Sequence, residues 1–189
     1  MVTTWPETLS VPVAGTVILF VLLGMLAELR ISRLNEKEYR RRGAIDAPDP
    51  VYAVMRWAYP CSFVAMAIEG ALSDVPLGWQ SHVGWMVFFA AKALKIQAII
   101  ALGPRWTYRV LVLPGAPLVT AGPYRFLRHP NYVAVVGELI GMGLMMHAVV
   151  TGPLMTLFFL ELLRRRVAAE ERALGLATPD RGTASGDRR

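Results

Sequence analysis

The chain has 189 residues, a formal net charge of +6 at pH 7, and a hydrophobic content of 54%. Its apolar residues come in long blocks, a pattern typical of membrane proteins. The basic residues border those blocks instead of alternating with surface aromatic residues, so the charge does not indicate nucleic-acid binding. The single cysteine, Cys61, excludes an intrachain disulfide, and we expect no metal site.

Three apolar blocks occupy the first half of the chain. Residues 11–29 are long enough to cross a bilayer, and no basic residue precedes them as in a secretory signal, so we expect a retained span. Residues 51–72 form a second block, in which Pro60 predicts a kink. Residues 82–102 form a third. Residues 30–42, between the first two blocks, are strongly basic.

The second half predicts a helical hairpin after a polar connection. Residues 103–127 are too polar to span, and we expect them on the membrane surface. Residues 131–150 form a fourth apolar block, and Thr151-Gly152-Pro153 predicts a tight turn. Residues 154–163 continue without a helix breaker toward Leu174, which predicts one helix that leaves the membrane.

These elements predict an all-α integral membrane protein with about five transmembrane helices. Residues 1–174 form a single domain in this interpretation, and the polar residues 175–189 form a disordered tail. With five spans, 17 of the 20 lysine and arginine residues fall on one side. The positive-inside rule then places the C-terminus in the cytoplasm and the N-terminus outside, in the inner or plasma membrane. Nothing in the sequence indicates the oligomeric state.

The segment 122–132, Gly-Pro-Tyr-Arg-Phe-Leu-Arg-His-Pro-Asn-Tyr, leads into the fourth span. Pro130 fits the first turn of a helix, where its missing N–H costs nothing. Arg128, His129 and Asn131 therefore crowd a helix N-terminus, where free N–H groups and the helix dipole attract anions. A plainer alternative is that these residues only anchor the helix at the membrane surface.

The predicted hairpin brings two polar segments together at one end. It places Tyr132 at the level of Glu171, and the residues that meet there are Arg128, His129, Asn131, Tyr132, Arg166, Glu170 and Glu171. Carboxylates can bind hydroxyl groups, and cations with helix N–H groups can bind a carboxylate, so the cluster suits a zwitterionic, sugar-bearing ligand. The alternative is two helix ends with solvated charges.

Glu138 lies deeper, about 10 Å into the fourth span. An unpaired charge at the centre of a span costs about 2.5 to 3.5 kcal/mol. We therefore expect Glu138 to pair with Lys95, at a similar depth, or with Arg165, either as a structural pair or at the wall of a substrate cavity. The spacing of Gly137 and Gly141 predicts close packing of this helix against a neighbour.

Three motifs resemble the isoprenylcysteine carboxyl methyltransferase family and its phospholipid methyltransferase relatives. They are the segment 122–132, the upstream Leu-Gly-Pro-Arg-Trp-Thr at 102–107, and Phe158-Phe159 followed by Arg-Val-Ala-Ala-Glu-Glu-Arg-Ala-Leu at 166–174. The resemblance covers residues 100–174, the catalytic half, and the first half is only generically similar.

The resemblance implies a membrane enzyme that transfers a methyl group from S-adenosylmethionine without a Rossmann fold. The cofactor would lie at the cytoplasmic edge under the C-terminal helix, and a lipid-tailed substrate would enter from the bilayer. The motif match places His129, Tyr132 and the pair Glu170-Glu171 in the cofactor site. Asn131 and Arg166 accompany them in the hairpin cluster, and Arg128 would face the reacting group. Relatives often continue with a tyrosine-rich tail, whereas this chain becomes polar after Leu174.

Several acceptors and two other protein classes stay open. An isoprenylcysteine-type carboxylate is ionised at pH 7 and needs no base, whereas a phenolic lipid needs one, with Glu138, His129 and Glu171 as candidates. A phospholipid amine is a further acceptor. A sterol-type reductase dependent on NADPH shares the Arg-His-Pro-Asn-Tyr element but usually continues with Gly-Asp. A non-catalytic membrane adaptor would bind no cofactor.

Overall fold

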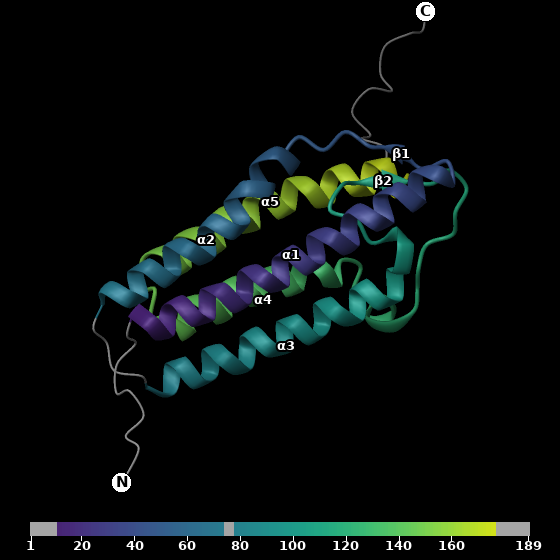
Figure 1. The fold of residues 1–189 in the computed structure, drawn as a ribbon. Helices are drawn as coiled ribbons and strands as arrows, with labels where there is room; N and C mark the ends of the chain where they lie inside the picture. Colours follow the sequence, from purple (N-terminus) through teal and green to yellow (C-terminus); the bar gives the residue numbers. More distant parts are fainter. Residues whose placement is uncertain (1–10, 74–77, 177–189) are drawn as a thin grey trace, which may run out of the picture.

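The computed structural model describes residues 11–73 and 78–176, and within them the chain forms five α-helices. Successive helices run in opposite directions along one bundle (Figure 1). Their bounds are Val11–Arg41 for α1, Tyr52–Leu72 for α2, Trp79–Leu102 for α3, Pro130–Met145 for α4 and Thr151–Ala173 for α5. The described residues contain no parallel sheet of the Rossmann type, so the all-helical prediction is confirmed.

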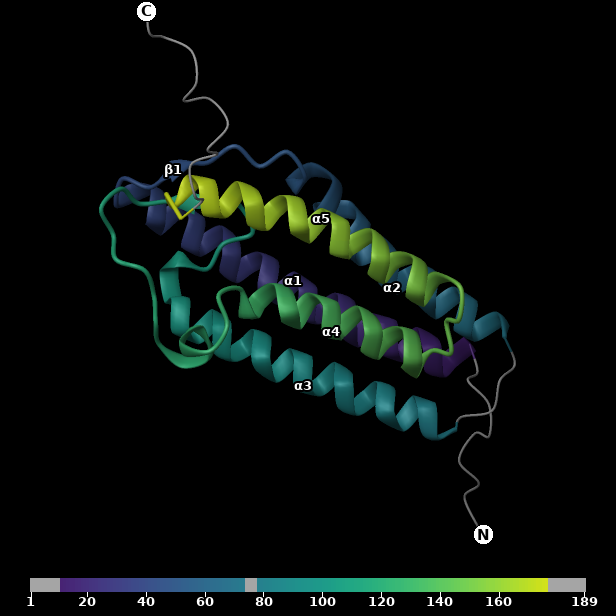
Figure 2. The ribbon, with the colours of Figure 1, turned by 180° about the vertical axis from the view of Figure 1, so that it is seen from behind.

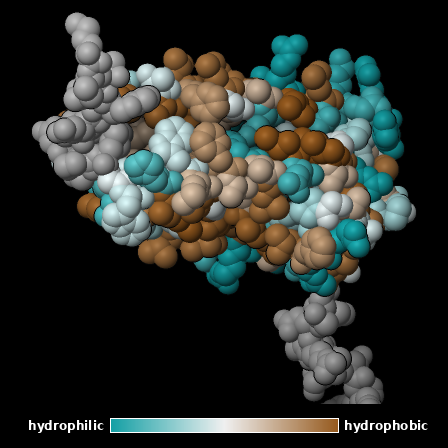
Figure 3. Space-filling model, turned by 90° about the horizontal axis from the view of Figure 1, so that it is seen from below, coloured by the Kyte–Doolittle hydropathy of each residue, from teal (hydrophilic) through white to brown (hydrophobic). Residues whose placement is uncertain are grey.

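Within residues 11–73 and 78–176, two helices are long and apolar enough to cross a membrane. They are Val11–Arg41 and Trp79–Arg105, the latter being α3 together with the short helix η1 (Gly103–Arg105). The apolar α4 has only 16 residues. In a view from below, hydrophobic residues cover much of the face that α3 presents (Figure 3), and Met86, Phe89 and Ile100 of that helix are exposed. The prediction of five spans is therefore supported for two helices and stays a prediction for the other three.

The central contact of the bundle is between α3 and α4, which lie side by side in both ribbon views (Figures 1 and 2). Glycines allow this approach. A Cβ added at Gly141 would lie 2.6 Å from the backbone nitrogen of Phe88, and one added at Gly84 would lie 2.4 Å from that of Met145. A Cβ added at Gly137 would lie 2.8 Å from the Cβ of Ala91. The close packing predicted from Gly137 and Gly141 is confirmed.

The hairpin turn differs from the prediction. Helix α4 ends at Met145 and not at residue 150, and the turn is formed by residues 146–150, with His147 at a positive φ of 50°. Thr151-Gly152-Pro153 is the first turn of α5 instead, because a proline near a helix start loses no hydrogen bond. The Glu69 carboxylate of α2 accepts the N–H of Thr151 at 2.7 Å and so caps this helix.

Helix α1 continues through the basic segment, past the predicted end at residue 29, and organises the polar connection. The Ser32 hydroxyl accepts the N–H of Tyr108 at 2.8 Å, and Asn35 donates to the carbonyl of Trp106 at 2.8 Å. Strand β1 (Ile45–Asp46) pairs antiparallel with β2 (Leu111–Val112), and a second 3₁₀ helix, η2 (Gly122–Arg125), precedes α4. The connection therefore folds over one end of the bundle, where α1 and α5 end and α4 begins.

Replacing Gly141 by alanine should lower the free energy of unfolding by about 1 to 3 kcal/mol, because the added methyl group would overlap the backbone of α3. The matched control is Gly24→Ala in α1, where nothing lies within 4 Å of an added Cβ. Thermal unfolding of both purified variants in one detergent measures the difference. Equal midpoints for the two variants would contradict the close α3–α4 contact.

Candidate functional site

A cavity of about 810 Å³ occupies the end of the bundle that the polar connection covers. All five helices and the segment 105–124 contribute to its wall. Its polar part includes Arg128, His129, Asn131, Tyr132, Arg166 and Glu170, and its apolar part includes Leu22, Met25, Leu26, Met55, Pro60 and Phe159. One hollow therefore joins the motif residues of the second half to apolar surfaces of α1 and α2.

The polar part is built by the facing ends of α4 and α5. The Tyr132 hydroxyl donates to the Glu170 carboxylate at 2.6 Å and accepts from Arg166 Nε at 3.0 Å. His129 Nε2 lies 3.3 Å from Glu171 Oε1, and the His129 ring stacks on that of Tyr132 with centroids 5.5 Å apart. The predicted meeting of the two segments is thus present. Its register differs by one residue, because Tyr132 meets Glu170 where Glu171 was expected.

Arg166 connects four segments of the chain. Its side chain is 7% exposed. Besides its bond to Tyr132, Nη1 forms an ion pair with Asp49 at 2.9 Å, and Nη2 donates to the carbonyl of Tyr108. The other oxygen of Asp49 accepts the N–H of Tyr52 at 3.1 Å, at the start of α2. Asp49 was not predicted as a site residue, because its only signal in the sequence is its place between two prolines just before an apolar block.

Two segments of the polar connection complete the wall. Trp106 is buried and its indole N–H donates to Asn131 Oδ1 at 3.3 Å, so the upstream motif and the segment 122–132 are in direct contact. Burial raises the pKa of Tyr124, and the negative charge of Glu170 raises it further. Burial and the charge of Glu28 likewise raise the pKa of Tyr108. Both tyrosines therefore stay protonated at neutral pH, and both line the cavity.

Arg128 points toward the glutamate pair, whereas the resemblance implied that it faces the reacting group. Its side chain is 75% exposed, and Nη1 lies 3.4 Å from Glu171 Oε1, so Arg128 and His129 share one carboxylate. Both residues nevertheless line the cavity. A single rotation of the exposed guanidinium frees it for a ligand, because an exposed ion pair of this kind is worth at most about 1 kcal/mol.

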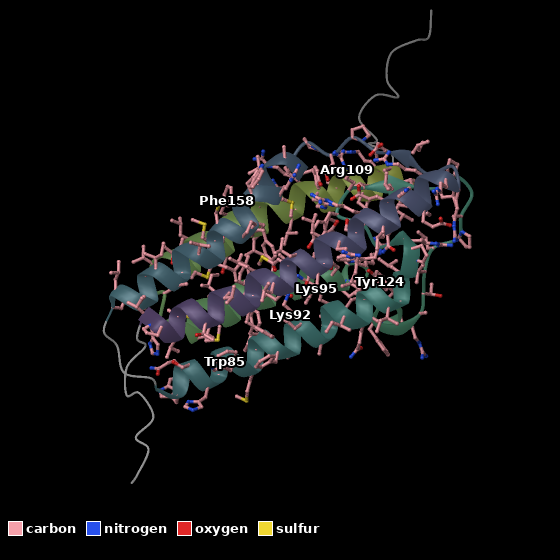
Figure 4. The ribbon with its side chains drawn as sticks, in the orientation of Figure 1. Trp85, Lys92, Lys95, Arg109, Tyr124 and Phe158 are labelled. Carbon is pink, nitrogen blue, oxygen red and sulfur yellow. The ribbon has the colours of Figure 1, made fainter. Side chains whose placement is uncertain are left out.

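A second polar cluster lies deeper in the bundle, and we refer to it as the floor cluster. Its members are Glu28, Tyr59, Lys92, Lys95, Tyr108 and Glu138. Lys95 pairs with Glu138 at 2.9 Å, as predicted, and Lys92 bridges Glu28 at 2.8 Å and Glu138 at 3.3 Å. Lys92 and Lys95 are labelled in Figure 4 on α3, beside α1. Two carboxylates and two ammonium groups thus neutralise one another inside an apolar bundle.

The members of the floor cluster differ in their access to the cavity. Glu138 is 0% exposed and is not among the lining residues, whereas Glu28, Tyr59, Lys95 and Tyr108 are. Arg165, the other predicted partner of Glu138, instead binds Glu161 on its own helix at 2.7 Å. Glu28 was not predicted as a site residue, because it stands at the end of the first apolar block and its spacing from the motif residues gives no signal of its place here.

Comparison with known proteins yields one family and two relatives. The model of the isoprenylcysteine carboxyl methyltransferase (ICMT) family matches residues 83–176. The chain is 30% identical over 158 residues to the uncharacterized protein YpbQ of Bacillus subtilis, covering 83% of this chain and 94% of that protein. It is 27% identical over 152 residues to an uncharacterized protein of Haemophilus influenzae, covering 80% and 88%. No solved structure matches the chain.

Proposed function

The chain belongs to the isoprenylcysteine carboxyl methyltransferase family, and on this premise we propose that it uses S-adenosylmethionine to methylate a lipophilic acceptor in a membrane. The observation that carries the proposal is the single cavity with two kinds of wall. Its polar part holds both halves of the family's motif, and its apolar part extends along Leu22, Met25 and Leu26 of α1. A charged cofactor and an apolar tail can therefore occupy one hollow.

The residues present fit the cofactor. S-adenosylmethionine carries an ammonium, a carboxylate, sugar hydroxyl groups and an aromatic base. Glu170 at the cavity wall, and Glu171 behind His129, can accept from the ammonium or the hydroxyl groups, and the His129 and Arg128 side chains can hold the carboxylate. Trp106, buried in the wall, offers an aromatic surface for the base. The tail beyond residue 176, where relatives often carry tyrosines, lies outside the described residues, and Leu174 and Leu176 contribute to the cavity wall.

The chemistry asked of the chain itself is modest. When bound, the cofactor supplies a methyl group on a positively charged sulfur, which is already a strong electrophile. The protein then has to align the acceptor with that group and exclude water. Each of these effects can lower the activation barrier by several kcal/mol. The half-buried Tyr132 and the buried Arg166 hold the polar wall rigid, and the exposed Arg128 is free to contact an acceptor oxygen.

We expect the purified protein to bind S-adenosylmethionine and to transfer its labelled methyl group to a component of a membrane lipid extract. His129→Ala and Glu171→Ala should each weaken cofactor binding by about 1.5 to 3 kcal/mol, through loss of a charge-assisted hydrogen bond. Calorimetric titration measures this. The control is Glu161→Ala, an exposed glutamate of the same helix.

Unchanged cofactor affinity in both the His129 and the Glu171 variants would remove the proposed site. Tight binding of NADPH without binding of S-adenosylmethionine would favour a reductase of the sterol type. Binding of neither would favour a non-catalytic adaptor.

Arg128→Lys should lose turnover while its affinity for the cofactor changes little. Lysine keeps the charge but lacks the planar fork that holds a carboxylate or phenolate through two hydrogen bonds. The control is Arg125→Lys in η2, three residues away on the same connection. Steady-state methylation and cofactor titration separate the two effects. Wild-type turnover in Arg128→Lys would reduce this residue to a surface anchor.

The proposed orientation puts the polar end of the bundle in the cytoplasm. The basic ends of α1 and α5 and the start of α4 lie together there, and the positive-inside rule favours the cytoplasm for such an end (Figure 2). Green fluorescent protein fused to the C-terminus should therefore fluoresce, and alkaline phosphatase at the same position should be inactive. The opposite pair of results would reverse the orientation.

A further inference from the structure

The floor cluster contains a carboxylate that neither the family motif nor the proposed cofactor contacts use. Glu28 belongs to α1, outside the matched residues 83–176, and its side chain is 12% exposed at the cavity wall. We propose that Glu28 accepts the proton of a hydroxyl group on the methyl acceptor, with Lys95 and Tyr108 holding it in position. This inference rests on the proposed function and names the acceptor class: a lipid with an acidic hydroxyl group.

The hydrogen bonds within the floor cluster determine which kind of ligand group it can bind. The ammonium of Lys95 donates to Glu138, Tyr59 and Glu28, at 2.9, 3.3 and 3.5 Å, which uses all three of its protons. The hydroxyl protons of Tyr59 and Tyr108 go to Glu138 and Glu28. No donor that faces the cavity is therefore left over in this cluster.

Acceptor capacity, by contrast, remains. An ionised carboxylate offers about four lone-pair sites. Glu28 uses one on Oε1, for Lys92, and two on Oε2, for Lys95 and Tyr108, the last two at the long distances of 3.5 and 3.3 Å. A ligand group that contacts Glu28 must consequently donate a hydrogen bond. A hydroxyl group does so, whereas an ionised carboxylate cannot.

Charge gives a second reason to favour a neutral donor. The two carboxylates and two ammonium groups of the floor cluster balance, so an incoming carboxylate would find no unpaired cation at this depth. A protonated amine could donate, but it would approach Lys95 and the positive sulfur of the cofactor. A neutral hydroxyl group avoids both penalties, since a charge without a partner is costly in an apolar interior.

Tyr108 connects the floor cluster to the proposed cofactor contacts. Its carbonyl oxygen accepts from Arg166, which also bonds Tyr132, while its hydroxyl group donates to Glu28 at 3.3 Å. Glu28 therefore lies within one tyrosine side chain of the polar wall. Leu22 lies six residues before Glu28 in α1, about 9 Å toward the helix N-terminus, and lines the same cavity. An acceptor with its hydroxyl group at Glu28 would place an apolar tail beside Leu22, Met25 and Leu26.

The proposed step balances without a further reactant. As the acceptor oxygen forms its bond to the methyl carbon, the carbon–sulfur bond breaks and its electron pair stays on sulfur. The O–H bond breaks, its electron pair stays on the oxygen, and the proton moves to the Glu28 carboxylate, which later returns it to water. Lys92 and Lys95 from α3 and Tyr108 face Glu28 directly, and Tyr59 and Glu138 lie behind them.

The test compares wild type and Glu28→Gln on three probes: a long-chain alkylphenol, a farnesylated N-acetylcysteine, and phosphatidylethanolamine. Wild type should methylate the alkylphenol, and Glu28→Gln should lower that turnover about 100-fold or more at pH 7, the usual loss for a missing general base. Turnover of the variant should then rise about tenfold per pH unit toward the phenol pKa of about 10, because the ionised phenol needs no base. Cofactor affinity should not change.

Two further proteins keep the test decisive. Glu161→Gln is the matched control on the surface of α5. Because Glu28→Gln leaves one ammonium group in excess, Glu28→Gln combined with Lys92→Met restores neutrality and should show the same loss and the same recovery at high pH. A merely structural role for Glu28 predicts no such recovery.

The outcomes separate the two proposals. Wild-type turnover in Glu28→Gln or in the double variant, or methylation by wild type of the cysteine carboxylate or the amine alone, would overturn the role of Glu28 and leave the methyltransferase intact. Absence of methyl transfer from S-adenosylmethionine to any probe or lipid would overturn both.

Discussion

The polar end of the bundle depends on the hydrogen bonds and the ion pair that the buried guanidinium of Arg166 makes. It holds α5 to α4 through Tyr132, to the start of α2 through Asp49, and to the polar connection through the carbonyl of Tyr108. Removing one partner of such a buried pair costs about 3 to 5 kcal/mol, because the other charge is left without compensation. These contacts hold the motif residues around the cavity in place. They do so although two of the connected segments, the one before α2 and the polar connection, are irregular.

Two polar clusters line the cavity at different depths. The shallow cluster, at the ends of α4 and α5, carries charges that are partly exposed and free to exchange partners, as the shared carboxylate of Glu171 illustrates. The floor cluster is balanced and internally bonded, so it can accept only what its spare lone pairs allow. In the proposed function, the shallow cluster binds the charged cofactor and the floor cluster selects the acceptor.

Close packing of α3 and α4 makes the floor cluster possible. Glycines at 84 and 141 bring the two backbones together, so that Lys95 of α3 reaches Glu138 of α4 directly. The pair was predictable because two opposite charges at one depth of an apolar bundle have few other partners. The contacts of this pair with Glu28 and Tyr59 were not predictable. They depend on how α1 and α2 pack against α3 and α4, and the hydrophobic periodicity of a sequence does not specify how helices pack against one another.

The sequence by itself determined the helical class, the union of the segment 122–132 with the Glu170-Glu171 pair, and the need for a cationic partner of Glu138, either Lys95 or Arg165. Each follows from local rules: apolar block length, an antiparallel hairpin, and the cost of a lone buried charge. Only the tertiary structure decided the hairpin turn, the one-residue register between Tyr132 and Glu170, and the roles of Asp49 and Glu28. The hairpin turn was mispredicted because Thr-Gly-Pro is a local pattern of both tight turns and helix starts. The roles of Asp49 and Glu28 were missed because their partners lie far away along the chain.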